Sequence, residues 1–525
     1  MTLPGWTLRQ KIGQLIVVRA SGYLFDQQIR YPQWEPPNAR LYDWLSTLNL
    51  GGVILLGGGG ADLYHRTRQL QAWSPTPLLI AADIEEGVGQ RFSGAAWLPP
   101  PMALGEIARR DLALACDYAE AFGAFTAQEA LALGINWILA PIADVNNNPQ
   151  NPVINIRAFG EDPETVGALV QAFIRGAQPY PALTCAKHFP GHGDTGTDSH
   201  LHLPVIPHAP EHLAEIELPP FQQAIAQGVD SVMSAHIQVP AWDTGAPATL
   251  SRAVLTGQLR QALGFEGLIV TDALIMGGIT QCGEPGEVAI RALDAGADIL
   301  LMPPDPVTVI DALVGAVESG RLTEGRIDAS LERIQRAKAK LDFNSAPDFP
   351  FDPTPVLDLG AEILLNSQRQ GGNLPLQTGA ETWENMLVVD DLLNCDVLNR
   401  VCPALKLPQS LGYSHRVFDQ TTLDLLNVGA EPCLLQVFVR GNPFRGQAGL
   451  SPEARAIYQT LLTSGRVRGL ILYGSPYVLE WFLSHLAPAT PWVFSYGQMP
   501  QAQALACQTL LGEAASQGQR KDVFV

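Results

Sequence analysis

The sequence predicts a (β/α)8 TIM-like barrel followed by a smaller three-layer α/β sandwich domain, and three observations lead to this fold class. At 525 residues the chain is too long for one ordinary hydrophobic core. Short apolar runs alternate with helix-like stretches through the first two thirds of the chain. Polar residues follow the ends of several of these runs, and barrels collect their functional side chains at that face.

The apolar runs have the length and composition of parallel strands that are buried on both faces. They lie at residues 12–18, 52–56, 78–83, 136–141, 182–187, 231–236, 268–272 and 299–302. The helix-like stretches between them include residues 109–133, 163–175, 213–227 and 251–263. This alternation predicts eight strand–helix units, which fit a barrel over residues 1–341.

The structural alternative to a barrel is an open, doubly wound sheet. Such sheets often bind nucleotides through a glycine-rich fingerprint. The glycine run at residues 57–60 lacks the Gly-x-Gly-x-x-Gly spacing and the Lys-Ser/Thr of a P-loop, so we expect only a tight turn there. We also expect the polar, proline-bearing residues 23–38 to form a loop over the barrel mouth.

The pattern changes after residue 341. Residues 342–356 are rich in proline and poor in aliphatic side chains, which predicts a linker. Beyond it, strand-like runs at residues 386–389, 434–439, 470–473 and 492–495 alternate with helical stretches at 452–462, 476–485 and 501–511. We therefore expect an α/β sandwich domain at residues 357–525. Because no acid/base pair or motif accompanies its strand ends, we expect it to be structural or to help shape the cleft.

The composition narrows the class of partner and the compartment. A net charge of −19 argues against nucleic acid and against anionic membrane surfaces, so a small or uncharged ligand is expected. The seven cysteines are scattered and odd in number, which favours reduced thiols over a disulfide framework. No signal-like stretch opens the chain and no apolar segment could span a bilayer, so we expect a cytoplasmic protein. The sequence does not indicate the oligomeric state.

Residues 187–200 form the segment richest in potential chemistry and read Lys-His-Phe-Pro-Gly-His-Gly-Asp-Thr-Gly-Thr-Asp-Ser-His. Its proline and glycines forbid a helix, so we expect these polar residues on a loop that leaves a strand end. Asp198 and His200 are two residues apart, close enough for the carboxylate to accept the imidazole N–H and fix its tautomer. His200 is therefore a candidate general acid/base, although a lone histidine is more often an ordinary residue.

A metal site is the alternative explanation for the histidines of this region, His188, His192, His200 and His202. A proline and a glycine break the helix that the i, i+4 pair His188 and His192 would need. No Cys-x-x-Cys and no His-Glu-x-x-His accompanies them. We expect no metal ion and no cofactor.

Polar and charged side chains gather at the C-terminal ends of the predicted strands. They are Asp83, Lys187, His188, His236 and Asp272. Asp272 directly follows a buried run, where an unpaired carboxylate is costly unless it is hydrogen-bonded or functional. From this position alone, a catalytic role and a cap on the next helix are equally supported.

Several ordered motifs are similar to those of one family. They are the 187–200 loop, Leu201-His-Leu-Pro204, Thr271-Asp-Ala-Leu-Ile-Met276 and Asn155-Ile-Arg-Ala-Phe-Gly160. Together they resemble glycoside hydrolase family 3, specifically its bacterial β-N-acetylglucosaminidase, or β-N-acetylhexosaminidase, branch. The likeness covers residues 7–340, and the second domain resembles the family's α/β sandwich in outline.

One segment departs from the family pattern. Where the family has Asp-Gln-Glu-Gly-Gly-Arg, residues 83–88 read Asp-Ile-Glu-Glu-Gly-Val. The chain thus gains Glu86 and has Val88 in place of an arginine, while Gln90 and Arg91 are kept.

The resemblance implies a role for each matching residue. Asp272 matches the nucleophile that forms a glycosyl-enzyme intermediate, and His200, oriented by Asp198, matches the acid/base. The matching sugar-binding residues are Asp83, Arg91, Arg157, Lys187 and His188. The implied loop could also open for product release, which its glycines would allow.

These matches imply a retaining, exo-acting hydrolase that releases terminal β-linked N-acetylglucosamine from peptidoglycan turnover fragments. The implied partner is this small carbohydrate, with no nucleic acid and no membrane. Two alternatives remain. A phosphorylase could use the same site, because a neutral histidine repels phosphate less than a carboxylate does. A non-catalytic sugar-binding protein is the third candidate, suggested by the altered segment at residues 83–88.

Overall fold

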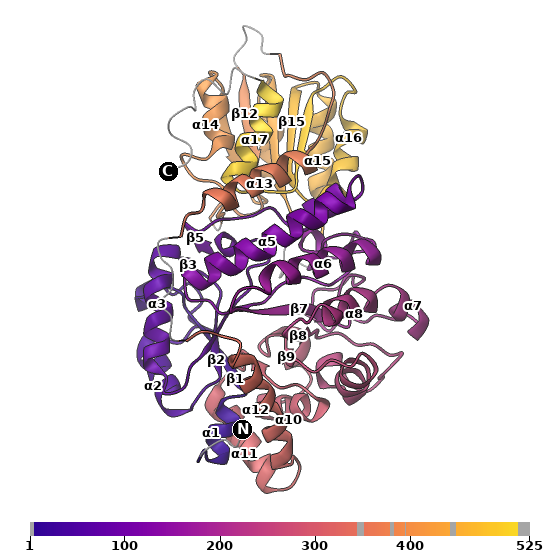
Figure 1. Cartoon of the computed structure of the whole chain (residues 1–525). Coiled ribbons are helices and arrows are strands. Elements are labelled where there is room, and N and C mark those ends of the chain that lie inside the picture. The colour runs from indigo at the N-terminus through magenta and orange to yellow at the C-terminus, as the bar shows by residue number, and fades with distance from the viewer. Residues whose placement is uncertain (1–4, 344–350, 378–382, 394, 442–447, 513–525) are drawn as a thin grey trace. The chain divides into compact units, whose positions relative to one another are not determined.

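The structure is a computed structural model and describes residues 5–343, 351–377, 383–393, 395–441 and 448–512. These residues group into two compact units (Figure 1). The first comprises Met1–Leu98, Asp111–Asn148 and Arg157–Leu357, and the second comprises Pro99–Arg110, Pro149–Ile156 and Asp358–Val525. The linker expected at 342–356 lies partly outside the described residues, at 344–350, and α13 (Thr354–Ser367) begins within its last residues. The domain boundaries therefore stay a prediction.

The first unit is built around a ring of eight parallel strands. They are β1 (Ile16–Ala20), β2 (Gly52–Leu55), β4 (Leu79–Ala82), β6 (Trp137–Ile138), β7 (Leu183–Phe189), β8 (Ser231–Ser234), β9 (Leu268–Thr271) and β10 (Leu300–Leu301). They pair in the order β10-β1-β2-β4-β6-β7-β8-β9. A parallel bridge between Val270 and Ile299 joins the two ends of this order. The barrel prediction is confirmed, and the open sheet is wrong.

Helices surround these strands (Figure 1). They are α1 (Leu8–Gly13), α2 (Asn38–Thr47), α3 (Gly60–Trp73), α5 (Leu112–Ala132), α6 (Pro163–Ala177), α7 (Pro210–Glu215), α8 (Leu218–Ala226), the π-helix Ala253–Ala262, α9 (Gly277–Thr280), α10 (Pro285–Ala295), α11 (Pro306–Glu318) and α12 (Glu324–Lys338). The barrel strands carry no exposed residue, as expected for strands covered on both faces.

Three local predictions were wrong, each for a visible reason. The run at 12–18 begins in helix α1, because the Thr7 side chain and the side chain of Gln10 form a capping box. The helix expected at 213–227 is two helices, α7 and α8, because prolines follow Leu218 and restrict the preceding backbone. The glycine run is not a simple turn, since β3 (Gly58–Gly59) pairs with β5 (Phe92–Ser93).

The second unit contains a six-stranded sheet in the order β11-β16-β15-β14-β12-β13. Its strands are β11 (Arg369–Gly371), β12 (Glu384–Val388), β13 (Ser414–Phe418), β14 (Cys433–Val439), β15 (Val467–Gly474) and β16 (Trp492–Ser495), and only β11 is antiparallel to its neighbour. The remaining helices are α4 (Met102–Ala108), α14 (Pro403–Ser410), α15 (Pro452–Thr463), α16 (Leu479–His485) and α17 (Pro500–Leu511). The expected sandwich is confirmed, but β11 and the half-exposed edge strand β13 escaped prediction because neither has a long apolar run.

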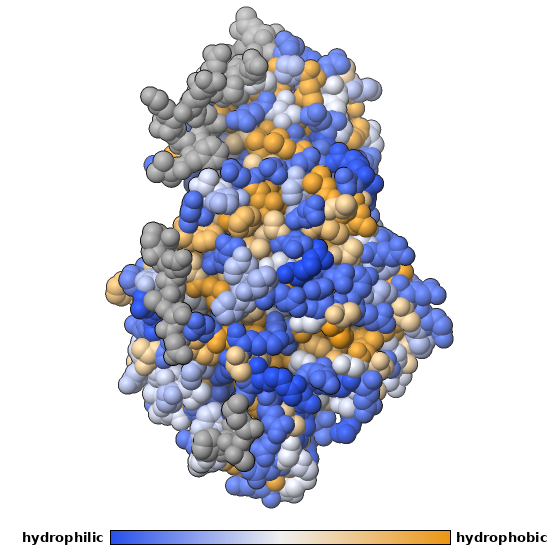
Figure 2. Space-filling model, in the orientation of Figure 1, coloured by the Kyte–Doolittle hydropathy of each residue, from blue (hydrophilic) through white to orange (hydrophobic). Residues whose placement is uncertain are grey.

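Within the described residues, no helix combines the length and the apolar character that a membrane crossing requires. On the face shown in Figure 2, hydrophobic side chains lie in small patches among hydrophilic ones.

Candidate active site

The predicted site residues lie at the C-terminal ends of neighbouring barrel strands. Asp83 directly follows β4, and Lys187 and His188 are among the last residues of strand β7. His236 comes two residues after β8, and Asp272 directly follows β9. Because the strands are parallel and adjacent, their carboxyl ends meet at one face, which brings these side chains together.

A buried ion-pair network anchors this face. Lys187 Nζ lies 2.6 Å from Asp83 Oδ1 and 2.7 Å from Glu85 Oε1. Arg157 donates two hydrogen bonds to Glu85, from Nε to Oε2 at 2.8 Å and from Nη2 to Oε1 at 2.7 Å. The side chains of Lys187 and Glu85 are each only 1% exposed, whereas Asp83 is 22% exposed. Asp83 is therefore the member of this network with access to a ligand.

Charge pairing outweighs the cost of burial in this network. Burial opposes ionisation of Glu85, but the charges of Arg157 and Lys187 hold its pKa well below the usual range. Burial likewise opposes the charge on Lys187, yet Asp83 and Glu85 raise the pKa of its ammonium group. The shifted pKa values favour the charged forms of both Glu85 and Lys187, and each of these charges has a partner within hydrogen-bond distance.

His188 is fixed by a carboxylate that the sequence analysis missed. Its Nδ1 lies 2.8 Å from Asp144 Oδ2, and its backbone N–H donates to Asp144 Oδ1 at 3.0 Å. Asp144 also accepts the backbone N–H of His192 at 2.7 Å. Burial opposes its ionisation, but His188 and the amide hydrogen bonds lower the pKa of Asp144. Asp144 follows the fourth apolar run by three residues, and this position at a strand end was the available signal.

Arg91 has a different setting. Its Nε donates to the backbone carbonyl of Asp83 at 3.1 Å, and its side chain is exposed. It therefore borders the site without joining the buried network.

Asp272 is held as a carboxylate. Its Oδ1 accepts the backbone N–H of Ala273 at 2.7 Å. Burial favours the neutral acid, but the imidazoles of His188, His236 and His200 favour the ionised form. Together with the amide they lower the pKa of Asp272 to about 2. The carboxylate can thus act as a nucleophile at any pH near neutrality.

The alternative that Asp272 caps the next helix is wrong. That helix, α9, begins at Gly277, and its N-cap is Met276. His236 supports the strand end instead, since its Nε2 donates to the carbonyl of Ala273 at 3.1 Å. Burial lowers the pKa of His236, although the charge of Asp272 partly opposes this.

Asp198 and His200 are in contact. Asp198 Oδ1 lies 2.9 Å from His200 Nδ1 and also accepts the His200 backbone N–H at 2.9 Å. The Asp198 side chain is 1% exposed and that of His200 is 21% exposed. A buried carboxylate thus orients an imidazole whose ring reaches the surface of the site.

The segment after Asp272 binds the backbone of this pair's loop. The N–H of Gly277 donates to His200 O at 2.9 Å, and that of Gly278 donates to Ser199 O at 3.1 Å. A Cβ on Gly277 would lie 2.7 Å from the carbonyl oxygens of His200 and Leu201. Glycine allows this close approach, and two adjacent backbone hydrogen bonds join the segment that follows Asp272 to the loop that carries His200.

The histidines that the sequence analysis considered as possible ligands of one metal ion have different hydrogen-bond partners. His188 binds Asp144, whereas the ring of His192 lies 2.8 Å from both Thr195 Oγ1 and Ser199 Oγ. His202 is exposed. The sequence analysis did not predict the contacts among His192, Thr195 and Ser199. These residues hydrogen-bond to one another within the loop and match no motif that would mark them.

The departure at residues 83–88 leaves the ion-pair network intact. Glu85, which matches the family pattern, provides the contacts to Lys187 and Arg157 described above. The additional carboxylate of Glu86 is buried and accepts the indole N–H of Trp97 at 2.9 Å. Gln90 Oε1 accepts the backbone N–H of Glu86 at 3.0 Å. Glu86 therefore stabilises the turn behind the site.

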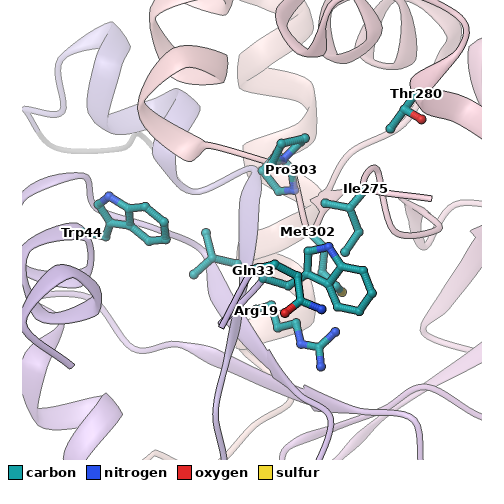
Figure 3. A pocket seen from close by; sticks show the side chains of 10 residues that line it. Arg19, Gln33, Trp44, Ile275, Thr280, Met302 and Pro303 are labelled. Carbon is teal, nitrogen blue, oxygen red and sulfur yellow. The ribbon is translucent and has the colours of Figure 1, made fainter. Parts of the chain in front are cut away.

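A pocket of about 280 Å³ opens at the same face, next to β1 and β10. Its lining is Val18, Arg19, Gln33, Trp34, Trp44, Ile275, Thr280, Met302, Pro303 and Pro304. Figure 3 shows Gln33, Met302 and Ile275 gathered on one side and Trp44 on the other. Residues 33 and 34 belong to the segment expected to cover the barrel mouth. The guanidinium of Arg19 lies 5.2 Å from the ring of Trp34, so the wall combines aromatic surface with a cation.

The family of the chain follows from two family models that match it. The model described as the Glycosyl hydrolase family 3 N terminal domain matches residues 7–337. The chain belongs to glycosyl hydrolase family 3. A second model, the Bacterial Glycosyl hydrolase family 3 C-terminal domain, matches residues 377–512. The family resemblance seen in the sequence is thereby confirmed for both domains.

Individual members of family 3 are similar as well. A protein named Beta-hexosaminidase A from Pseudoalteromonas piscicida is 35% identical over 403 residues, which are 70% of this chain and 66% of that protein. A Beta-hexosaminidase from Chromobacterium violaceum is 39% identical over 57% of this chain and 85% of its own length. The solved family 3 beta-N-acetylglucosaminidase from Paenibacillus sp. str. FPU-7 has a TM-score of 0.79 at 29% identity and covers 97% of both chains.

Proposed function

We propose that the chain is a retaining, exo-acting β-N-acetylhexosaminidase that releases terminal β-linked N-acetylglucosamine. The names of its similar family members support the reaction class. The observation that carries the mechanism is the Asp198–His200 pair, hydrogen-bonded through its loop to the segment that follows an ionised Asp272.

In the first step of the proposed mechanism, the Asp272 carboxylate attacks the anomeric carbon as the bond to the leaving oxygen breaks. That oxygen takes a proton from the imidazolium of His200. The product is a glycosyl ester on Asp272. Because Asp198 occupies Nδ1, the proton leaves from Nε2.

In the second step, the neutral His200 takes a proton from water, and the water oxygen displaces Asp272 from the anomeric carbon. Two inversions at this carbon give net retention. Asp198 stabilises the imidazolium that forms again, which restores the starting state.

We assign the sugar-binding roles by exposure. Asp83 accepts hydrogen bonds from sugar hydroxyls, while the buried Lys187, together with Glu85 and Arg157, fixes its position. The exposed Arg91 provides a further donor at the rim, and the largely buried His188, held by Asp144, provides one from within the site. This division follows because a side chain that is 1% exposed, such as Lys187, has little surface left for a ligand.

The charge balance favours water over phosphate as the acceptor. The carboxylates of the site are Asp83, Glu85, Asp144, Asp198 and Asp272, and the fixed cations are Lys187, Arg157 and Arg91. A surplus of negative charge repels an incoming phosphate and stabilises an oxocarbenium-like transition state. Hydrolysis is therefore our first candidate, and phosphorolysis the alternative.

We further propose that the substrates are peptidoglycan turnover fragments handled in the cytoplasm. Terminal N-acetylglucosamine is what an exo-acting enzyme of this specificity would take from such fragments. All seven cysteines lie in the part of the chain that the structure describes, and all are free thiols. Free thiols of this number suit a reducing compartment.

The first experiment compares nitrophenyl β-N-acetylglucosaminide with the β-glucoside in phosphate-free buffer and again with phosphate. Release from the first substrate without phosphate supports the hydrolase, and proton NMR should show the β-anomer as the initial product. Release only with phosphate, together with a sugar phosphate product, would replace it by the phosphorylase.

Asp272→Ala then tests the covalent step. We expect turnover to fall by about 10⁴-fold or more with the fold retained, and added azide to restore glycoside cleavage by forming the α-glycosyl azide. Equal lack of turnover by the wild type and Asp272→Ala, with sugar still bound in a titration, would leave the non-catalytic sugar-binding protein.

A further inference from the structure

A cluster of potential metal ligands joins the 187–200 loop to the segment that follows it. His208 Nε2 lies 2.6 Å from Asp194 Oδ2, and the rings of His208 and His212 are 4.0 Å apart between centroids. One ligand atom from each of these three residues falls within 4.8 Å of the others. Glu217 lies outside this group but next to it, with its Oε1 3.6 Å from His212 Nε2, so a small shift of its side chain would add a fourth ligand.

Two members of this cluster carry buried polar atoms that lack the partners such atoms require, although the His212 side chain as a whole is 38% exposed. The Glu217 side chain is 3% exposed, and among the described residues neither of its carboxylate oxygens has a hydrogen-bond partner. His212 Nε2 is likewise buried and unsatisfied. Leaving such atoms unpaired is costly, so the cluster as it stands lacks a group that would satisfy it.

Backbone packing holds Glu217 in this position. It precedes α8, at the break before the two prolines, and its side chain packs against Gly191. A Cβ on Gly191, whose φ is +131°, would lie 2.7 Å from Glu217 Cγ. The loop therefore packs closely against the side chain of Glu217, and the carboxylate lies close to His212 Nε2.

We propose that Asp194, His208, His212 and Glu217 bind a zinc ion. Two imidazoles and two carboxylates form a four-ligand N/O set of the kind that Zn²⁺ takes in tetrahedral sites. Neighbouring ligands of such a site are roughly 3.3 Å apart, given Zn–N and Zn–O bonds of about 2.1 Å. Zinc binding replaces the hydrogen-bonded proton between His208 and Asp194, lengthens that contact and provides the missing partner for Glu217.

The ion would tie three segments together. Asp194 belongs to the loop that carries Asp198 and His200, His208 precedes α7, His212 lies on α7, and Glu217 precedes α8. A bound zinc ion thus restrains the loop through Asp194, in addition to the hydrogen bonds from Gly277 and Gly278. The site is independent of the proposed reaction, because none of its ligands is in the ion-pair network or the Asp198–His200 pair.

The test uses the full-length protein, first stripped with a chelator and then titrated with Zn²⁺ in competition with a chromophoric zinc indicator. We expect one ion per chain, with a dissociation constant tighter than roughly 10 µM. Saturating zinc should raise the apparent melting temperature by about 5 °C. Replacement by Co²⁺ should give the visible d–d absorption of a four-coordinate site.

Three variants distinguish zinc binding at this site from zinc binding by other histidines. His212→Gln should abolish the binding and the melting shift, and Glu217→Gln should weaken both. His65→Gln, the same change at an exposed histidine on α3, should bind as the wild type does. Circular dichroism of the zinc-free variants checks that they fold. Amide exchange of residues 190–200 should slow on zinc addition in the wild type and not in His212→Gln.

Two results would overturn the proposal. One is a wild type that binds no zinc in this range. The other is a His212→Gln or Glu217→Gln protein that folds and binds zinc as tightly as the wild type. Both readouts are independent of glycosidase activity, so a failed hydrolase proposal leaves this test unaffected.

Discussion

At the scale of single residues, Asp272 and His200 are held in different ways. Asp272 directly follows a barrel strand, and its ionisation is set by the imidazoles around it. His200 lies on a loop, and its orientation depends on one buried carboxylate, Asp198. The two groups should therefore respond differently to pH and to mutation.

The ionisation of Asp272 sets the first expectation. Its pKa of about 2 lies below the usual aspartate value, so the nucleophile is ionised at every pH above that value. With an activated leaving group, which needs no proton donor, kcat/KM should show no decline assignable to Asp272 between pH 7 and pH 4. The measurement is a pH profile with a dinitrophenyl glycoside. An acidic limb that moves when His236 is replaced by Gln would contradict a nucleophile that is already fully ionised.

Removal of the candidate acid gives the second expectation. His200→Ala should lower kcat/KM about 10²- to 10⁴-fold for a disaccharide or another poor leaving group, and far less for a dinitrophenyl glycoside. The reason is that a good leaving group departs without protonation. A Brønsted plot against leaving-group pKa should be steeper for the variant. Equal losses of kcat/KM on good and poor leaving groups would exclude His200 as the acid. For poor leaving groups, the kcat/KM of Asp198→Asn should lie between those of His200→Ala and the wild type.

At the scale of elements, the loop at residues 190–200 is fitted tightly to its surroundings. A Cβ on Gly193 would lie 1.7 Å from Val145 O, so this glycine serves close packing. The same holds for Gly277, which contacts the loop from the other segment. Gly196, by contrast, meets nothing closer than 4.0 Å, and the opening of this loop stays a prediction.

Gly277→Ala tests this contact. Its Cβ would meet two backbone oxygens at 2.7 Å, so the loop must shift and misplace His200. We expect kcat to fall at least about 10-fold for poor leaving groups, with a smaller effect on KM. Gly315→Ala is the matched control, because the added Cβ on α11 meets nothing within 4 Å. That control should keep activity and gain about 0.5–1 kcal/mol of stability. Unchanged kinetics in Gly277→Ala would count against the coupling.

At the scale of the whole molecule, the dependence of stability on pH reflects buried carboxylates of two kinds. Glu85 has cationic partners and a depressed pKa, so its contribution is present above its unfolded value and is lost as pH falls through the folded one. Glu129 has no such partner. Burial raises its pKa to about 7, although the Ala96 amide partly opposes this. Its contribution to folding stability is fully present below its unfolded pKa of 4.5 and is lost as pH rises toward its folded pKa of about 7.

Two glutamine variants should therefore change stability in opposite directions. Glu85→Gln leaves buried cations underpaired and should cost about 3 kcal/mol or more at pH 7. Glu129→Gln removes an ionisation penalty and should add about 3 kcal/mol at pH 8, and much less at pH 4.5. Denaturant unfolding across this pH range measures both. A Glu129→Gln gain that is the same at both ends would show that its carboxyl is not the titrating group.

The sequence revealed those parts of the molecule that depend on local pattern. Apolar runs located the barrel strands, and the position of Asp272 after such a run placed it at the correct face. Asp144 was missed because its partners, His188 and His192, are more than 40 residues away in the chain and share no motif with it. The break before α8 could have been read from its two prolines. The Asp194–His208–His212 group could not, because only the path of the loop brings these residues together.

The functional face of the barrel is divided between two arcs of the ring. The charged groups arise from β4, β7, β8 and β9, whereas the pocket is lined mainly from β1, the segment after β10, residues 33 and 34 and Trp44, and shares only the segment after β9. Selection for a new substrate can therefore act on the pocket while the reacting groups stay unchanged. A library restricted to Gln33, Trp34 and Thr280 should yield altered preferences among sugars and aglycones at little cost in folding, because these side chains support neither the ion-pair network nor the Asp198–His200 pair.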